Sequence, residues 1–582
     1  MYEAVKTSLR KNCFEDDFLI TKMVSILKKG DPLLIKNRRY INVGKMQQQF
    51  LMKIVAICIL VYAEKNDLLG DKQFGFRSAM GCDTAVATFM YKMGTIHKNS
   101  AATMVCLDLS SAFFCVTHTN LLNLFRRLID EKAMKFFLKL LEQRKAVLYA
   151  KGETTEVFDI PQVGTAQGEA TSPIFFILIM SGCLKYALDG LKKNSLVGSD
   201  ATMFADDMQL LNWADNIDSL KNMTFNMTQK VMEYCANCGF KVNSKKSEVI
   251  MFGNPIIRDQ FENPFMSSAG AISHKKIMNM LGIRFNAKLG FKPQIEHILS
   301  KLDWHTSNIH RLHNIGLKNH ILKVLFSSCF GSFNYGLGLM PYWSQKLYGE
   351  AQVKLNRAIR RICGLKLTDG HHVRQRVMLR LVNILPFHLQ HKRMALLLLN
   401  RVMRNEKPVE LFNIIKSHLD VPEEWSPHKK PLLSHELNGE APCIKQNSEH
   451  TLNANQSVLK RIFPVTCKDW FNKLPWDIRY CLGTKKFDHK ILNHYQEECF
   501  HPIEKNELKC SECRYKANFE KIDLNQLVQN IQLEFNNSVT SHKSYDDQII
   551  SLNLLFKCVL LKINENEDVF INDSNWSYEA NS

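Results

Sequence analysis

Hydrophobic positions along the chain follow both the two-residue period of strands and the longer apolar runs of buried helices. The stretch TMFADDMQLL, which begins at Thr202, places apolar, strand-favouring residues on both sides of an Ala-Asp-Asp break. This pattern predicts a β-hairpin with its tight turn at the break. The stretch TMVCLDLSSAFFCV, residues 103–116, predicts a buried strand that ends in the carboxylate of Asp108.

Two longer apolar stretches predict buried helices. IVAICILVYA, residues 54–63, is too short to span a bilayer and is bounded by Lys53 and Glu64, so we expect it to be a buried helix. PQVGTAQGEATSPIFFILIMSGCL, residues 161–184, begins with small and polar residues and continues as an apolar run. This order predicts a loop that leads into a buried helix starting near Pro173.

Basic residues mark two further stretches. Residues 286–375 are expected to be helical, and EAQVKLNRAIRRICGLK, residues 350–366, places Lys354, Arg357 and Arg361 on one helical face. That face suits contact with a phosphate backbone, although a solvated helix surface explains the pattern equally well. In CGFKVNSKKSEVIMFG, residues 238–253, Lys245 and Lys246 precede a predicted strand. Such lysines either bind or protonate a phosphate group or are ordinary solvated turn residues.

The composition is that of a folded protein with a polyanionic partner. The 582 residues are 45% hydrophobic and 23% charged, which excludes wholesale disorder and predicts several domains. The formal net charge of +19 indicates nucleic acid or an anionic surface as a partner. Residues 517–582 contain four Lys or Arg and ten Asp or Glu, a net of −6, so residues 1–516 carry about +25 (19 + 6). The expected polyanion site therefore lies upstream of this acidic, Asn-rich tail.

Cysteine usage indicates a reducing compartment. The seventeen cysteines follow no framework spacing and no secretory signal opens the chain, so we expect a nuclear or cytoplasmic protein without a transmembrane segment. Cys499, His501, Cys510 and Cys513 have a spacing compatible with zinc, but chance clustering explains them better in a chain with this many cysteines.

The adjacent carboxylates of Asp206 and Asp207 are the strongest candidate for chemistry. Two like charges in a partly buried hairpin repel each other, and a hard divalent cation with oxygen ligands would neutralise them. Asp108 would supply a third ligand, and two Mg²⁺ ions held this way support in-line phosphoryl transfer. Simpler readings remain open: a solvated acidic turn for the pair and a helix cap for Asp108.

The order of these stretches resembles the reverse transcriptase domain of non-LTR (LINE-type) retrotransposons. The resemblance includes Asp108 with the following AF, the QG of the small-residue loop, FADD, GFKVNSKKSE and MLGIRF at 280–285. Upstream, ILKKGDP at 26–32, NRRYI at 37–41 and QFGFRSAMGCDTA at 73–85 resemble the family's fingers motifs. Downstream, residues 384–408 and 471–487 resemble the carboxy-terminal part of jockey-like elements. FADD alone is a weak signal, but the ordered set, from about residue 20 to 500, is specific.

This resemblance implies an α+β fold arranged as a right-hand polymerase. The implied order is fingers at 1–100, a palm with the catalytic carboxylates at 101–285, a helical basic thumb at 286–375, a mainly helical region at 376–500 and the acidic tail at 501–582.

Roles carried over by motif concern three groups of residues. Asp108 and Asp206 would be the principal ligands of two Mg²⁺ ions, with Mn²⁺ as an alternative and Asp207 as the supporting carboxylate. Lys246 would protonate the departing pyrophosphate. The remaining implied contacts are with nucleotide or template at Arg39, Arg77, Phe113, Gln167 and Gly168, and with the primer at Leu281 and Gly282. The ring of Phe113 would exclude ribonucleotides, so the expected product is DNA.

The implied function is RNA-directed DNA polymerisation on an RNA template, with a DNA primer, dNTPs and an accessory RNA-binding protein of the same element as partners and no membrane. The competing hypotheses are a decayed or domesticated mobile-element remnant that only binds nucleic acid, and a DNA-templated or template-independent polymerase. Because Met1 falls almost at the fingers and leaves no room for the family's endonuclease, target cleavage is expected to come from elsewhere or to be absent. A truncated reading frame is an equal alternative.

Five positions depart from the family pattern, and none removes a metal ligand. Glu169 is expected to weaken nucleotide affinity by placing a negative charge near phosphate. The five positions are Tyr40, Phe114, Ala166, Glu169 and Thr171.

Overall fold

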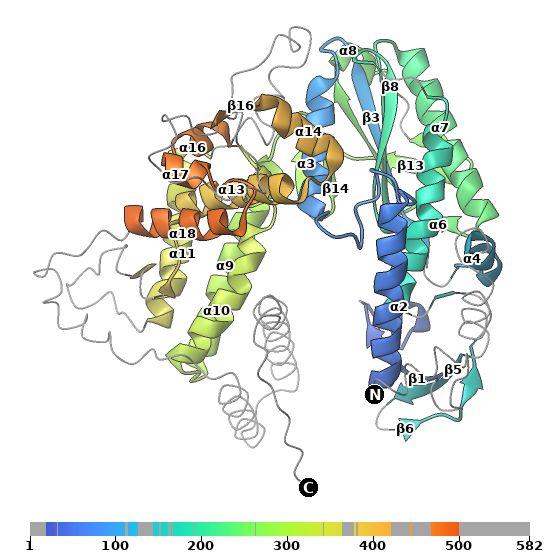
Figure 1. The fold of residues 1–582 in the computed structure, drawn as a ribbon, viewed down its shortest axis with the longest axis horizontal. Helices are drawn as coiled ribbons and strands as arrows, with labels where there is room; N and C mark the ends of the chain where they lie inside the picture. Colours follow the sequence, from blue (N-terminus) through green and yellow to red (C-terminus); the bar gives the residue numbers. More distant parts are fainter. Residues whose placement is uncertain are drawn as a thin grey trace, which may run out of the picture. The chain divides into compact units, whose positions relative to one another are not determined.

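The computed structural model describes residues 19–499 except for 29, 32, 111–114, 126–143, 151–152, 161–163, 166, 192–193, 262–263, 342, 364–377, 380–381, 421–442 and 445–466. The fold is α+β, and the chain divides into two compact units (Figure 1). Unit 1 contains residues 1–294, 339–341 and 398–483, and unit 2 contains 295–338, 342–397 and 484–582. The units interleave along the chain, whereas the sequence predicted consecutive domains, and the functional boundaries stay a prediction.

A six-stranded sheet forms the centre of unit 1. Its strands are β3 (Ala101–Leu107), β8 (Gly198–Phe204), β9 (Asp207–Ala214), β11 (Glu248–Gly253), β12 (Phe265–Ser267) and β13 (Gly270–His274), in the order β12-β13-β11-β3-β9-β8. All neighbouring pairs are antiparallel except β11 with β13. The predicted strand at residues 103–108 and the two predicted strands of the FADD hairpin are therefore confirmed as the neighbours β3, β9 and β8, with β8 at the edge of the sheet.

Helices cover both faces of this sheet. On one face, α6 (Thr171–Leu188) and α7 (Ile217–Asn237) pack on β8, β9 and β3, where alternate residues such as Val105 and Leu107 point into the shared core (Figure 1). On the other face, Phe89 of α3 (Cys82–Thr95) stacks on Phe285 with ring centroids 5.6 Å apart, and Phe252 of β11 completes the aromatic cluster. Helix α6 confirms the predicted buried helix and begins at Thr171, close to the predicted Pro173.

The second predicted buried helix is confirmed as a helix, but only one of its faces is buried. Helix α2 (Met46–Lys65) includes residues 54–63 and buries Leu51, Met52 and Val55 against the core, but Ile57 and Val61 are exposed. A short apolar run without polar interruptions does not reveal which face is buried. Helices α2 and α6 are long and apolar enough to cross a membrane by length and composition. The apolar window of α6 is 72% buried and that of α2 is 33% buried, and two such helices are weak evidence for a membrane span.

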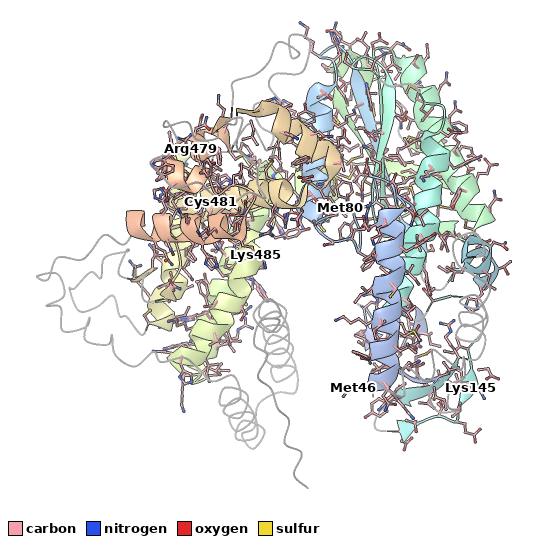
Figure 2. The ribbon with its side chains drawn as sticks, in the orientation of Figure 1. Met46, Met80, Lys145, Arg479, Cys481 and Lys485 are labelled. Atoms are coloured by element: carbon pink, nitrogen blue, oxygen red, sulfur yellow. The ribbon has the colours of Figure 1, made fainter. Side chains whose placement is uncertain are left out.

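A small sheet lies at one end of α2. It contains β1 (Ile20–Leu27), β2 (Arg38–Val43), β5 (Lys145–Ala150), β6 (Glu153–Thr154) and β7 (Phe158–Asp159). Strand β1 pairs antiparallel with β2 and parallel with β5. Met46 at the start of α2 and Lys145 at the start of β5 mark this end, while Met80 lies toward the opposite end of α2 (Figure 2).

Short elements complete unit 1. The hairpin of β14 (Ile277–Met280) and β15 (Ile283–Asn286) follows the large sheet. The others are η1 (Ile35–Asn37), β4 (Leu109–Ser110), α4 (His118–Phe125), β10 (Lys241–Val242), α8 (Pro255–Arg258), η3 (Leu337–Leu339, which ends within this unit), α14 (Val409–His418), β16 (Leu419–Asp420), β17 (Cys443–Ile444), α16 (Lys468–Asn472) and α17 (Trp476–Arg479).

Unit 2 is helical. Its helices are α9 (Lys292–Asn314), α10 (Asn319–Asn334), α11 (Gln345–Ile362), the first part of α13 (Phe387–Asn405) and α18 (Lys485–Cys499). In α11, Lys354 forms an ion pair with Asp303 of α9, and Arg361 contacts His310 of the same helix, whereas Arg357 is exposed. Two of the three basic residues that were predicted to share one helical face, Lys354 and Arg361, therefore contact side chains of α9 within unit 2.

The core packing predicts a large difference between two phenylalanines. Phe176 of α6 is fully buried, whereas Phe225 of α7 is 46% exposed. We expect Phe176→Ala to lower the free energy of unfolding by about 3–5 kcal/mol, because it removes buried apolar surface and leaves a cavity. Phe225→Ala is the matched control and is expected to change it by less than about 0.5 kcal/mol. Urea unfolding followed by circular dichroism measures both, and equal effects would contradict this packing.

Candidate active site

The FADD stretch forms a two-residue hairpin turn. Phe204, the last residue of β8, pairs with Asp207, the first residue of β9, so the turn consists of Ala205 and Asp206. The sequence predicted the hairpin correctly but assigned Asp207 to the break rather than to the strand. Ala205 has a φ of 56°, which belongs to the left-handed region that alanine rarely adopts. Such a conformation persists only where surrounding contacts enforce it.

Asp108 lies across from this turn on the neighbouring strand. In the antiparallel pairing of β3 with β9, Leu107 is opposite Met208. Asp108 is the next residue after β3, so continuing the register places it opposite Asp207. The three carboxylates predicted from segments a hundred residues apart therefore meet at one end of the sheet.

The backbone of Asp108 is fixed by the turn after β10. Its N–H donates to Ser247 Oγ at 3.2 Å, and its carbonyl accepts from the N–H of Asn243 at 2.8 Å. Lys246 lies in the same turn, and its Nζ is 3.8 Å from Asp108 Oδ2. The Lys246 side chain is 68% exposed, so its ammonium group reaches both the carboxylate and solvent.

Partial burial, with repulsion between the carboxylates as the smaller effect, raises the pKa of both Asp206 and Asp207. The pKa of Asp207 is raised to about 6 by partial desolvation and by the charges of Asp206 and Asp108. Partial burial and Asp108 also raise the pKa of Asp206, while the nearby guanidinium of Arg39 acts in the opposite direction. The site therefore holds more negative charge than its own cations neutralise.

These residues fit a divalent cation by their chemistry. All three supply hard oxygen ligands, and Asp108 Oδ2 is buried without a hydrogen-bond partner. Within the described ranges, no group of three or more His, Cys, Asp or Glu side chains is drawn together closely enough to hold a metal ion. The donor set therefore suits a cation, but its side chains would have to move closer together to enclose one.

Strand β2 and the QG loop lie beside the carboxylates. Arg39 is exposed on β2, and farther along that strand the N–H of Asn42 donates to the carbonyl of Gln167 at 2.7 Å. Gly168 has a φ of 114°, and a Cβ there would lie 2.4 Å from the carbonyl oxygen of Asn42. Only glycine permits this approach. The side-chain Oε1 of Gln167 is buried without a hydrogen-bond partner.

The charge of Glu169 has a compensating neighbour. The guanidinium of Arg144 lowers the pKa of Glu169, whereas burial, the larger effect, raises it. Arg144 Nη2 also lies 3.0 Å from the carbonyl oxygen of Gly164 and from His118 Nε2. The predicted repulsion of nucleotide phosphate by Glu169 is therefore reduced by a cation that the sequence did not reveal.

The guanidinium group of Arg77 is buried and bonded to other residues of the protein. Its guanidinium forms an ion pair with Glu64 at 2.7 Å and donates to the carbonyl oxygens of Gly70 and Gln73. The residue is 9% exposed. These contacts favour a structural role over the predicted contact with nucleotide, because the donors already have acceptors within the protein.

Leu281 and Gly282 form the turn between β14 and β15. Both have positive φ values, 51° and 81°, as in the type I′ turns of tight hairpins. Leu281 packs on the cluster of Phe74, Met80 and Ala85, which also contacts Phe204 next to the catalytic candidate turn. The structure thus brings this predicted hairpin close to the carboxylates.

Several predicted residues lie outside the described residues. Phe113 falls in the undescribed segment 111–114, and His501, Cys510 and Cys513 follow the last described residue, while Cys499 is the last residue of α18. Three residues that hold the backbone around the carboxylates were not predicted from the sequence: Gln73, Asn243 and Ser247. Gln73 belongs to the quoted QFGFR motif, but its tertiary partner could not be read from that motif.

The chain matches one protein family. Residues 26–285 match the family model described as "Reverse transcriptase (RNA-dependent DNA polymerase)". The matched range contains all three carboxylates and covers just under half of the 582 residues. No curated protein matches the chain.

Among solved structures, telomerases of two Candida species are similar to this chain. Apo telomerase from Candida tropicalis, truncated from its C-terminal domain, has 15% identity and a TM-score of 0.32 over 49% of this chain and 58% of that one. The complexes with a TWJ fragment of telomeric RNA have TM-scores of 0.36, with 12% identity for Candida tropicalis (71% of this chain, 67% of that one) and 11% for Candida albicans (72% and 66%). The match thus spans 58–67% of those telomerase chains, and at these scores the likeness carries no argument about function.

The raised pKa of Asp207 predicts a pH-dependent gain of stability on its removal. Because the folded-state pKa near 6 exceeds the ordinary 3.8, ionisation opposes folding, fully above about pH 6 and not at all below about pH 4. We expect Asp207→Asn to raise the thermal unfolding midpoint by a few degrees at about pH 7.5 without divalent cations, and to leave it unchanged near pH 4. Circular dichroism measures the midpoint, and an unchanged or lower midpoint at the higher pH would contradict the raised pKa of Asp207.

Proposed function

We propose that this chain is an RNA-directed DNA polymerase that extends a DNA primer with dNTPs on an RNA template, because residues 26–285 match the reverse transcriptase family model. The observation that carries the proposal is the meeting of Asp108, Asp206 and Asp207 at one end of the sheet. Nucleotidyl transfer concentrates negative charge on phosphate, so it requires cations held beside the reacting groups. A carboxylate cluster of this kind is suited to holding them.

In this proposal, Asp108 and Asp206 hold two Mg²⁺ ions and Asp207 supports them. Bound cations of this kind would activate the attacking hydroxyl and neutralise charge on the leaving pyrophosphate. The chain's own residues keep the carboxylates in register and exclude water from the buried side of the sheet. Lys246, held 3.8 Å from Asp108 and largely exposed, is suited to donating a proton to the leaving group.

The proposed substrate contacts surround the carboxylates. Arg39 supplies positive charge next to Asp206, and the buried, unpartnered Oε1 of Gln167 leaves a hydrogen-bond acceptor for template or nucleotide. The turn at Leu281 and Gly282 is suited to contacting the primer end. Phe113 is proposed to exclude ribonucleotides, as the family resemblance implies.

The proposed architecture is the right-hand polymerase, with fingers, palm and thumb in the order expected from the sequence. Support comes from the sheet of unit 1, which presents the carboxylates, and from the helices of unit 2. We further propose that the chain derives from a non-LTR retrotransposon, on the strength of the ordered motifs from about residue 20 to 500. Its net charge of +19 agrees with nucleic-acid binding, and an accessory RNA-binding protein of the same element is an expected partner.

The test is primer extension on poly(rA)/oligo(dT) with Mg²⁺. Asp206→Asn is expected to reduce synthesis by at least about a hundredfold with RNA binding retained, because it removes a charge that holds the cations. Asp215→Asn is the matched control, since Asp215 is exposed and follows the other end of β9. RNA binding without extension by the wild type would contradict the proposal and support a nucleic-acid-binding remnant.

A further inference from the structure

The turn that presents Asp206 is supported by a distant segment of the chain, residues 72–75. The N–H of Met203 in β8 donates to the carbonyl of Lys72 at 2.9 Å, and the N–H of Phe74 donates to the carbonyl of Met203 at 2.7 Å. Gln73 and Met203 form a parallel bridge. Since β8 is the last strand in the order of the large sheet, this segment adds a short strand to its edge.

The side chain of Gln73 extends this support into the turn itself. Its Oε1 accepts hydrogen bonds from the N–H of Ala205 at 3.0 Å and from the N–H of Gly75 at 2.9 Å. Gln73 is fully buried and Ala205 is 4% exposed, so water does not replace these bonds. The bond to Ala205 holds the residue whose left-handed backbone directs the chain into Asp206.

The close fit of Gly75 against the turn is independent evidence for this arrangement. A Cβ on Gly75 would lie 2.4 Å from the backbone nitrogen of Ala205 and 3.1 Å from its Cα. Backbone atoms cannot give way as a flexible side chain can. The segment therefore touches the turn directly and leaves no room for a side chain at this position.

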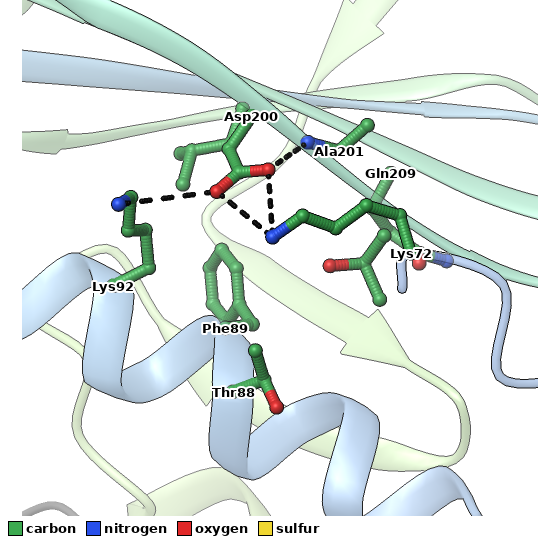
Figure 3. Close-up of a pocket in the computed structure, with 9 residues that line it drawn as sticks. Lys72, Thr88, Phe89, Lys92, Asp200, Ala201 and Gln209 are labelled. Carbon is green, nitrogen blue, oxygen red and sulfur yellow. Dashed lines mark hydrogen bonds and ion pairs between the residues drawn. The ribbon is translucent and has the colours of Figure 1, made fainter. Parts of the chain in front are cut away.

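Charged residues anchor the other end of the segment. Lys72 Nζ forms an ion pair with Asp200 of β8 at 3.1 Å, and Lys92 of α3 lies 3.9 Å from the same carboxylate (Figure 3). Lys72 Nζ also forms an ion pair with Glu410 of α14 at 2.6 Å. The segment is thus tied to the sheet on one side and to α14 on the other. It therefore has anchors on β8 and α14 in addition to its contacts with the turn.

We propose that Gln73 is a positioning residue for the reaction: it fixes the backbone of Ala205 and thereby the place of the Asp206 carboxylate. This inference rests on the proposed function, in which Asp206 holds a divalent cation. Only the oxygen of the Gln73 amide is used, since its Nε2 has no hydrogen-bond partner. A side chain of equal length with an accepting oxygen is therefore sufficient.

The test compares Gln73→Met, which keeps the volume and removes the acceptor, with the wild-type protein. We expect kcat for primer extension to fall by about tenfold to a hundredfold with little change in the KM for template–primer, because a small displacement of a catalytic group has this cost. Affinity for Mn²⁺, measured by electron paramagnetic resonance without substrate, is expected to fall by about tenfold. Unchanged kcat and unchanged Mn²⁺ affinity would overturn the inference.

Two rescue variants separate positioning from general stability. Gln73→Glu is expected to restore most of the Mn²⁺ affinity, because it keeps an accepting oxygen and burial favours its neutral form. Adding Ala205→Gly to Gln73→Met is expected to restore part of it, because glycine adopts positive φ without a supporting bond. Failure of both rescues would contradict the role of the hydrogen bond.

A control and a second variant complete the design. Gln352 is also buried and accepts a backbone N–H, from Phe387 at 2.8 Å, but within unit 2. Gln352→Met is expected to lower thermal stability without changing Mn²⁺ affinity, and an equal loss of affinity would overturn the specific role of Gln73. If Gln73→Met does not fold, Gly75→Ala tests the same contact, since its Cβ displaces Ala205, and unchanged Mn²⁺ affinity there would overturn the inference.

The two hypotheses fail in different ways. A wild-type protein that binds Mn²⁺ through Asp206 but does not extend a primer contradicts the proposed function. In that protein, weaker Mn²⁺ binding by Gln73→Met still supports the positioning role. Normal extension by both proteins, with equal Mn²⁺ affinity, leaves the proposed function intact and removes the role of Gln73.

Discussion

The hydrogen-bonded register between β3 and β9 is the constraint on which the candidate active site depends. With Leu107 opposite Met208, the end of β3 delivers Asp108 to the start of β9, where the hairpin turn supplies Asp206 and Asp207. A slip of one residue would turn every side chain of β9 to the other face of the sheet. The apolar residues of β3, β8 and β9 that pack beneath α6 and α7 prevent this slip, so the buried core fixes the position of the acidic groups.

The site places stability and function in opposition. Its carboxylates repel each other, the turn contains a left-handed alanine, and Asp108 keeps a buried oxygen without a hydrogen-bond partner. Each of these features is unfavourable in the free protein, and together they are suited to a divalent cation. The opposing contributions come from backbone and side-chain hydrogen bonds of neighbouring residues that do not supply carboxylates: Asn243 and Ser247 around Asp108, and residues 72–75 beside the hairpin.

Local sequence pattern was sufficient for the strands, the hairpin and helix α6, because apolar periodicity and turn residues determine such elements within a few positions. The same pattern marked the three carboxylates as candidates, but by itself it favoured a solvated turn for Asp206 and Asp207 and a helix cap for Asp108. The order of the motifs along the chain selected them. Local pattern failed where the partner lies far along the chain. In the sequence Arg77 looks available to bind nucleotide, but in the structure it forms an ion pair with Glu64. The role of Gln73 depends on its hydrogen bond with Ala205, which lies more than a hundred residues away in the sequence. The exposed face of α2 could not be read from an uninterrupted apolar run.

The central claim is that Asp108 and the Asp206-Asp207 hairpin bind divalent cations together. The most direct measurement is the anomalous scattering of Mn²⁺ in crystals of the protein with template–primer and a non-reactive nucleotide. We expect anomalous density in contact with the carboxylates of Asp108 and Asp206, with the three acidic side chains closer together than in the free protein. Density elsewhere, or none at saturating Mn²⁺ while nucleotide is bound, would contradict it.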